Sequence, residues 1–143
     1  MHPNTITIED LIPHREQMKL VDDIVSVDDQ GAVTAAVVSE RWPASAASGV
    51  GAVVLIELVA QTAGICIGWR ELKKHGNTTG GRGWLVGIKK AVFHLDPLPF
   101  GARMVTATRQ TFSFEGLSEI AGHVRIGDRS IAEITLQVVQ EED

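Results

Sequence analysis

The stretch GVGAVVLIELVAQTAGICIG, residues 49–68, decides the fold of this 143-residue chain. Its only polar side chains are those of Glu57, Gln61 and Thr62, and Glu57 carries its only charge. So long an apolar run predicts a buried helix, which we expect to continue through Lys74. A carboxylate inside such a helix is costly unless it is paired or used in chemistry.

Glu57 and Gln61 lie four residues apart, so both side chains project from one face of the predicted helix. Gly64 and Gly68 continue that face over the next turns. We therefore expect Glu57 to be a catalytic carboxyl group and Gln61 to line the substrate site beside it. The alternative is a buried and paired carboxylate without a chemical role, although Gln61 alone cannot neutralise it.

The charge of the chain argues against nucleic acid as a partner. The net charge is -5 and the pI is about 5.5, whereas a protein that binds phosphates usually has a basic excess. Six basic residues nevertheless fall close together in the sequence, either as a surface for an acidic partner or as a solvated helix end and loop. They are Arg70, Lys73, Lys74, Arg82, Lys89 and Lys90.

The sequence gives no sign of a metal or a cofactor. The single cysteine, Cys66, excludes an internal disulfide, and we expect it to be a buried, unreactive thiol. No Cys/His cluster of the metal-binding type occurs. The glycine-rich segment 76–83 lacks the ending of a phosphate-binding loop, so we interpret it as a flexible link.

The first residues, MHPNTITIEDL, have neither the basic start nor the apolar run of a signal peptide, so we expect a cytoplasmic protein. The apolar stretch is long enough to cross a bilayer. Glu57 and Gln61 would then lie near the bilayer midplane, and Gly51 would fall in the first turn. We therefore expect a buried helix and no membrane.

Strand patterns flank the predicted helix on both sides. A short helix at 9–12 is closed by Pro13, and a loop at 40–48 leads into the long helix. The predicted strands are 20–27 and 32–39, joined by a turn at 28–31, and then 84–95, 103–114, 117–126 and 130–139. We expect residues 1–143 to form a single α+β domain of the hot-dog type, in which one curved antiparallel sheet wraps the long helix.

Two motifs carry a family resemblance. LIPHR at 11–15 followed by MKLVD at 18–22 resembles the LPHR-x-P-x-L-L-V-D opening of the β-hydroxyacyl-acyl carrier protein dehydratases of fatty acid biosynthesis. VLIELVAQTAG at 54–64 is similar to that family's V-L-I-x-E-A-x-A-Q-x-A-G. KAVF at 90–93 and the turn at 97–101 resemble the strand and turn that follow. The resemblance implies a hot-dog fold, paired as a dimer whose sheets join edge to edge, with active sites at the subunit boundary.

The sequence departs from this family at the catalytic histidine. The family carries it in a G-H-F-P segment before the helix, whereas the corresponding segment here is Glu40-Arg41-Trp42-Pro43. Arg41 therefore stands where the histidine is expected. The following loop also lacks the family's G-N-P-x-M-P-G sequence. In keeping the helix glutamate without the histidine, the chain resembles a divergent branch, the dehydratase-like subunits of aryl polyene gene clusters.

Dehydration of a 3-hydroxyacyl thioester needs a base for the α-proton, an acid for the hydroxyl group and a hydrogen-bond donor for the thioester oxygen. The resemblance assigns the hydroxyl end to Glu57, and apolar neighbours favour the protonated form of a carboxyl group. We expect free amides within 49–53 to bind the thioester oxygen, with Gly49 and Gly51 allowing close approach. Arg41 and Trp42 complete the predicted substrate-binding set.

The base is missing, and three explanations remain open. A related hot-dog subunit supplies the histidine in a heterodimer, or His14, His94 or His123 has taken the role, or the chain is a noncatalytic partner. The leading interpretation is a dehydratase-like protein of fatty acid or polyene biosynthesis that binds a thioester of acyl carrier protein or coenzyme A, as a homodimer or heterodimer. The alternative enzyme is an acyl thioesterase of the hot-dog type.

Overall fold

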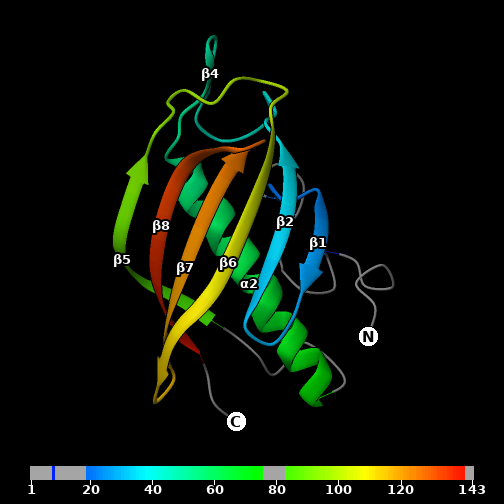
Figure 1. Cartoon of the computed structure of the whole chain (residues 1–143), viewed down its shortest axis with the longest axis vertical. Coiled ribbons are helices and arrows are strands. Elements are labelled where there is room, and N and C mark those ends of the chain that lie inside the picture. Colours follow the sequence, from blue (N-terminus) through cyan, green and yellow to red (C-terminus); the bar gives the residue numbers. More distant parts are fainter. Residues whose placement is uncertain (1–7, 9–18, 76–82, 141–143) are drawn as a thin grey trace.

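One long helix lies along the inner face of a curved antiparallel sheet (Figure 1). The computed structural model describes residues 8, 19–75 and 83–140. The helix is α2 (Val54–His75), and the six strands follow the order β1-β2-β6-β7-β8-β5. The strands are β1 (Asp23–Val27), β2 (Gly31–Val37), β5 (Gly83–Phe93), β6 (Arg103–Phe114), β7 (Leu117–Ile126) and β8 (Arg129–Gln140). The predicted hot-dog fold is therefore confirmed.

The long strands after the helix agree closely with the prediction, because their patterns are local. The bounds of β6 and β7 coincide with the predicted strands, and β8 is one residue longer at each end. The strand predicted from Leu20 begins only at Asp23; the amide of Leu20 donates to the Gln61 side chain and not to a neighbouring strand. The predicted short helix at 9–12 and the glycine-rich segment 76–82 lie outside the described residues; Ile8, just before them, is buried.

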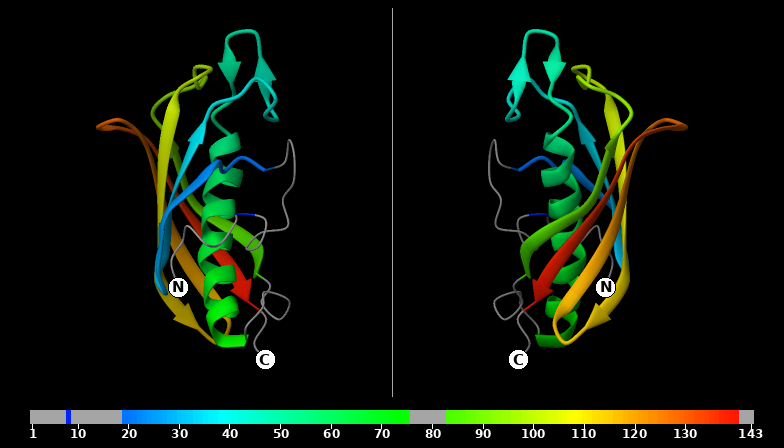
Figure 2. Two further views of the ribbon diagram at one scale, coloured as in Figure 1. Left: turned by 90° about the vertical axis from the view of Figure 1, so that its right-hand side faces the viewer. Right: turned by 90° about the vertical axis from the view of Figure 1, so that its left-hand side faces the viewer.

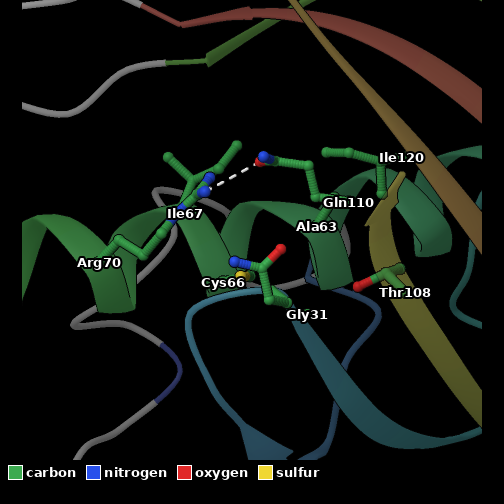
Figure 3. Close-up of a pocket in the computed structure, with 9 residues that line it drawn as sticks. Gly31, Ala63, Cys66, Ile67, Arg70, Thr108, Gln110 and Ile120 are labelled. Carbon is green, nitrogen blue, oxygen red and sulfur yellow. Dashed lines mark hydrogen bonds between the residues drawn. The ribbon is translucent and has the colours of Figure 1, made fainter. Parts of the chain in front are cut away.

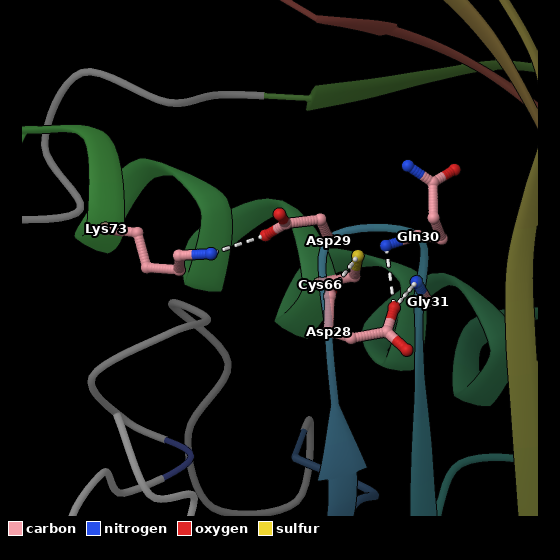
Figure 4. A network of polar contacts seen from close by, with 6 residues as sticks. All are labelled: Asp28, Asp29, Gln30, Gly31, Cys66 and Lys73. Atoms are coloured by element: carbon pink, nitrogen blue, oxygen red, sulfur yellow. Dashed lines mark hydrogen bonds and ion pairs between the residues drawn. The ribbon is translucent and has the colours of Figure 1, made fainter.

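The turn between β1 and β2 is fixed by an aspartate, as its composition predicts. The Asp28 carboxylate accepts hydrogen bonds from the backbone amides of Gln30 at 2.7 Å and Gly31 at 3.0 Å (Figure 4). Such a side chain satisfies the amides that a tight turn leaves without strand partners. The turn brings Asp28 and Asp29 against the C-terminal half of α2.

The start of the helix differs from the prediction. Residues predicted to open the helix instead form a two-residue strand, β4 (Gly49–Val50), which pairs with β3 (Ser45–Ala46). This small hairpin stands beyond the end of the sheet (Figure 2). Val50 also bridges to Leu98 in the loop after β5. No helix in the described part of the chain is long and apolar enough to cross a membrane.

The helix lies close to the sheet at a glycine of β7. A Cβ atom added at Gly122 would lie 2.4 Å from Cγ1 of Val59, so only a glycine fits at this point. Further along the helix, the hydroxyl groups of Thr62 and Thr34 lie 2.9 Å apart in the same interface. Both contacts belong to the interface between the helix and the sheet.

The close contact predicts a measurable coupling between the two residues. Gly122→Ala should lower the free energy of unfolding by about 1–3 kcal/mol, because the new methyl group overlaps the Val59 side chain. Val59→Ala removes that overlap, so the double variant should lose less than the sum of the two single losses. Chemical denaturation of the four proteins measures the difference, and strictly additive losses would contradict the described packing.

Candidate functional site

Glu57 and Gln61 are joined by a hydrogen bond, as their spacing predicts. Glu57 is half-buried in the first turn of α2, and its Oε1 accepts a hydrogen bond from Nε2 of Gln61 at 3.2 Å. Gln61 is fully buried. Its Oε1 accepts a second hydrogen bond, of 2.9 Å, from the backbone amide of Leu20. The contact with Leu20 was missed, because no side-chain pattern marks the backbone amide of a residue 41 positions away.

This pair lies on the side of the helix that faces away from the sheet. Val59 packs at Gly122 of β7, and Glu57 lies about 160° from Val59 around the helix axis. The Gln61 amide reaches the chain before β1. A substrate would therefore reach Glu57 from outside the helix-sheet interface.

The amides before the helix already have partners, so the prediction that they are free is wrong for three of them. The amide of Val50 donates to the Leu98 carbonyl at 2.9 Å, and that of Gly51 donates to the Ala44 carbonyl at 2.9 Å. The amide of Ala52 donates to Oδ1 of Asp96 at 3.0 Å. The predicted thioester site on the amides of these three residues is therefore occupied by the chain itself.

The two glycines of this segment have different structural roles. A Cβ atom at Gly49 would lie 2.3 Å from the Leu98 carbonyl oxygen, and φ at Gly49 is +142°. The close bridge between β4 and the loop after β5 thus requires a glycine at this position. A Cβ atom at Gly51 would meet Ala44 only at an ordinary 3.4 Å. A close approach of substrate to either glycine stays a prediction.

Arg41 and Trp42 differ sharply in the solvent exposure of their side chains. Trp42 is 6% exposed and belongs to the hydrophobic core, whereas the Arg41 side chain is exposed. The backbone amide of Arg41 donates to Oγ of Ser39 at 3.1 Å and holds the turn. Packing in the core accounts for a tryptophan at position 42. The predicted substrate contacts of Arg41 and Trp42 stay predictions.

Two candidate histidines, His94 and His123, face away from the helix. His123 lies on β7, whereas His94, predicted within the strand 84–95, comes just after β5, which ends at Phe93. His123 follows Gly122 in β7, and alternate residues of a strand point to opposite faces, so its ring lies on the outer face. Its Nε2 lies 2.8 Å from Oγ of Ser130. His94 lies 3.4 Å from the carboxylate of Glu133, which is the register partner of His123. Hydrogen bonding by His94, with the nearby Lys90 ammonium, lowers the pKa of Glu133.

Of the remaining histidines, His14 lies outside the described residues. Within the described ranges, no group of three or more His, Cys, Asp or Glu side chains is placed to hold a metal ion.

Cys66 lines a small cavity between the helix and the sheet (Figure 3). The cavity holds about 10 Å³, which is room for a single water molecule and not for a substrate. The thiol donates to the Asp28 carbonyl at 3.2 Å. Burial raises the pKa of the Cys66 thiol to about 11; the charge of Arg70 opposes this rise, and those of Asp28 and Asp29 add to it. These surroundings agree with an unreactive thiol.

The fold places the basic residues that lie close together in the sequence on different surfaces of the protein. Lys73 on the helix pairs with Asp29 at 2.9 Å (Figure 4), while two lysines of β5 pair on the outer face of the sheet. Lys89 lies 2.7 Å from Glu119, and Lys90 lies 3.5 Å from Glu133. These ion pairs favour the interpretation as solvated, paired charges. Arg82 lies outside the described residues.

The fold defines a hot-dog protein, with a carboxyl group on the outward side of its central helix. The sequence model of the ApeP-like family, described as ApeP dehydratase, matches residues 6–143. The chain belongs to this family. A search of curated proteins finds no match.

Solved structures agree with the fold at low sequence identity. The dehydratase heterocomplex ApeI:P from Xenorhabdus doucetiae has a TM-score of 0.81 at 18% identity, over 96% of this chain and 93% of that chain. A sigma28-regulated virulence protein from Campylobacter jejuni has a TM-score of 0.71 at 15% identity, over 95% and 88%. A hypothetical thioesterase with coenzyme A from Streptococcus pneumoniae has a TM-score of 0.67 at 11% identity, over 85% and 86%.

The environment of Cys66 predicts slow thiol chemistry in the folded protein. A pKa about two units above that of an ordinary thiol lowers the thiolate fraction about 100-fold near neutral pH, and burial blocks access as well. Labelling by an aromatic disulfide reagent should therefore be at least about 100-fold slower in the native protein than in concentrated urea. The Cys66→Ser variant provides the blank, and equal rates in both solvents would contradict the buried position.

Proposed function

We propose that this chain is the carboxyl-bearing subunit of a 3-hydroxyacyl thioester dehydratase in fatty acid or polyene biosynthesis. Its substrate is an acyl chain carried by acyl carrier protein or coenzyme A, and a related hot-dog subunit supplies the histidine. The observation that carries this proposal is Glu57, held by Gln61 on the side of the helix away from the sheet. Membership of the ApeP-like dehydratase family supports it.

The proposed reaction assigns one proton transfer to each subunit. The histidine of the partner removes a proton from Cα of the substrate, and the electron pair forms the Cα–Cβ double bond. The hydroxyl group leaves Cβ with the proton of Glu57 and becomes water. The products are an enoyl thioester and water, and Glu57 recovers its proton from the histidine or from solvent.

Three observations support a partner. The imidazoles of His94 and His123 lie on the outer face of the sheet, with the helix on the inner face. The similar structure from Xenorhabdus doucetiae is described as a heterocomplex. Arg41 occupies the place of the family histidine, so a self-contained site would need another base.

We propose that the partner joins the sheet along β5. This strand ends the sheet, and the hydrogen-bonding groups of an edge strand are available for another strand. Three of its large apolar side chains are about half exposed: Leu85 at 45%, Val86 at 58% and Ile88 at 48%. An edge strand with this much exposed apolar surface is expected to be covered by a second subunit.

A thioesterase is the second candidate, favoured by the similar structure described as a hypothetical thioesterase with coenzyme A. In that reaction Glu57 would activate water or attack the thioester carbonyl, and free thiol would be released. Incubation with octanoyl and 3-hydroxyoctanoyl thioesters separates the two activities. Enoyl product supports dehydration, and thiol released from both substrates supports hydrolysis.

The proposal predicts that Glu57→Gln abolishes turnover without preventing assembly. In a complex with a hot-dog subunit that carries the histidine, the variant should lower kcat for 3-hydroxyoctanoyl thioesters by roughly 10²–10⁴-fold, because its amide cannot donate the acid proton. Formation of the enoyl thioester measures the rate. Asp29→Asn, in the turn between β1 and β2 and far along the sheet order from β5, is the control and should keep full turnover. Unchanged turnover of Glu57→Gln would indicate a noncatalytic partner instead.

The proposed edge predicts which substitutions prevent pairing. Val86→Glu and Ile88→Glu place charges on β5 and should leave both subunits as monomers in sedimentation experiments. Phe112→Glu changes a side chain that is equally exposed but lies on β6, and it should leave the complex intact. A homodimer of this chain that is fully active on its own would refute the heterodimer.

A further inference from the structure

We infer that Gln61 is a positioning residue for Glu57 and not a substrate contact, and that it ties the carboxyl group to the chain before β1. The inference rests on the proposed function of Glu57. The Gln61 side chain is fully buried, with Nε2 at 3.2 Å from Glu57 and Oε1 at 2.9 Å from the Leu20 amide. The amide group therefore bridges two parts of the protein.

Leu20 determines which way the Gln61 amide points. A backbone N–H can only donate, so the atom that faces Leu20 must be the side-chain oxygen. The amide nitrogen then faces Glu57, whose oxygen accepts its hydrogen bond. The opposite orientation would place two donors together at Leu20 and two acceptors together at Glu57. Only one orientation satisfies both neighbours.

The support for this bridge is rigid at its far end. Leu20 is 1% exposed and Val21 is 0% exposed, so the donating backbone is held in the core. The amide of Asp22 then donates to the Ala35 carbonyl at 3.0 Å, which joins the same segment to β2. A carboxyl group tied through Gln61 to this segment loses rotational freedom before the substrate binds, and this favours proton transfer.

Two substitutions separate the two ends of the bridge. Gln61→Glu keeps an oxygen for the Leu20 amide but removes the amide donor to Glu57, whereas Gln61→Met, of similar length, removes the hydrogen bonds to Leu20 and to Glu57. Thr62→Val is the control, because Thr62 is equally buried on the same helix but its hydroxyl bonds to Thr34 and to the Leu58 carbonyl.

The inference predicts a loss in kcat and not in substrate affinity. In the assembled complex, Gln61→Met and Gln61→Glu should each lower kcat for 3-hydroxyoctanoyl thioesters by about 10–100-fold, with KM changed less than about threefold. With Gln61→Glu the alkaline limb of the kcat profile should also move to higher pH, because a second carboxylate strengthens proton binding at the pair. Thr62→Val should keep the kcat and the pH profile of the original protein.

Hydrogen exchange, which needs no turnover, checks the hydrogen bond between Gln61 and the Leu20 amide. In Gln61→Met the amide of Leu20 should exchange its hydrogen faster than in the original chain, while Gln61→Glu should preserve its protection. A raised KM with unchanged kcat would make Gln61 a substrate contact and overturn the inference. If Glu57→Gln keeps full turnover, the proposed function itself fails; if Glu57→Gln is inactive and both Gln61 variants keep their kcat, only the positioning role fails.

Discussion

The contact between Val59 and Gly122 determines the orientation of everything on the helix. Because β7 has no side chain at that point, the helix can lie close to the sheet, and its rotation is fixed by the valine that fills the space. Thr62 then meets β2, and Gln61 meets the chain before β1. Glu57 is left on the opposite side. The same rotation of the helix therefore turns Val59 toward the sheet and Glu57 away from it.

The sheet has a similar division between its faces. Its inner face holds apolar and threonine side chains against the helix, while the outer face carries paired charges, His123 of β7 and the His94 ring beside Glu133. A β-strand alternates strictly, so a side chain cannot change faces without a bulge or a shift in register. Under the proposed function, this explains why a base for the reaction is more easily recruited from another subunit than from these strands.

The sequence predicts the parts of this molecule that depend on local patterns. Alternation and the turn at Gly127 predict β7 and β8, and spacing by four residues predicts the bond between Glu57 and Gln61. The start of the helix could not be predicted, because β4 is held by its pairing with β3 and by a bridge to Leu98, which is distant in the sequence. The hydrogen bond from the Leu20 amide to Gln61 could not be predicted either, because it joins a backbone group to a side chain that is distant in the sequence.

The bond from the Ala52 amide to Asp96 has a consequence for the order of folding. The two residues are 44 positions apart, so the residues just before the helix gain this partner only after β5 and its following loop have formed. During synthesis from the N-terminus, the helix leaves the ribosome before that carboxylate exists. Its first turn, which holds Glu57, is therefore expected to fray until the second half of the chain is made, and to become ordered together with the closing sheet.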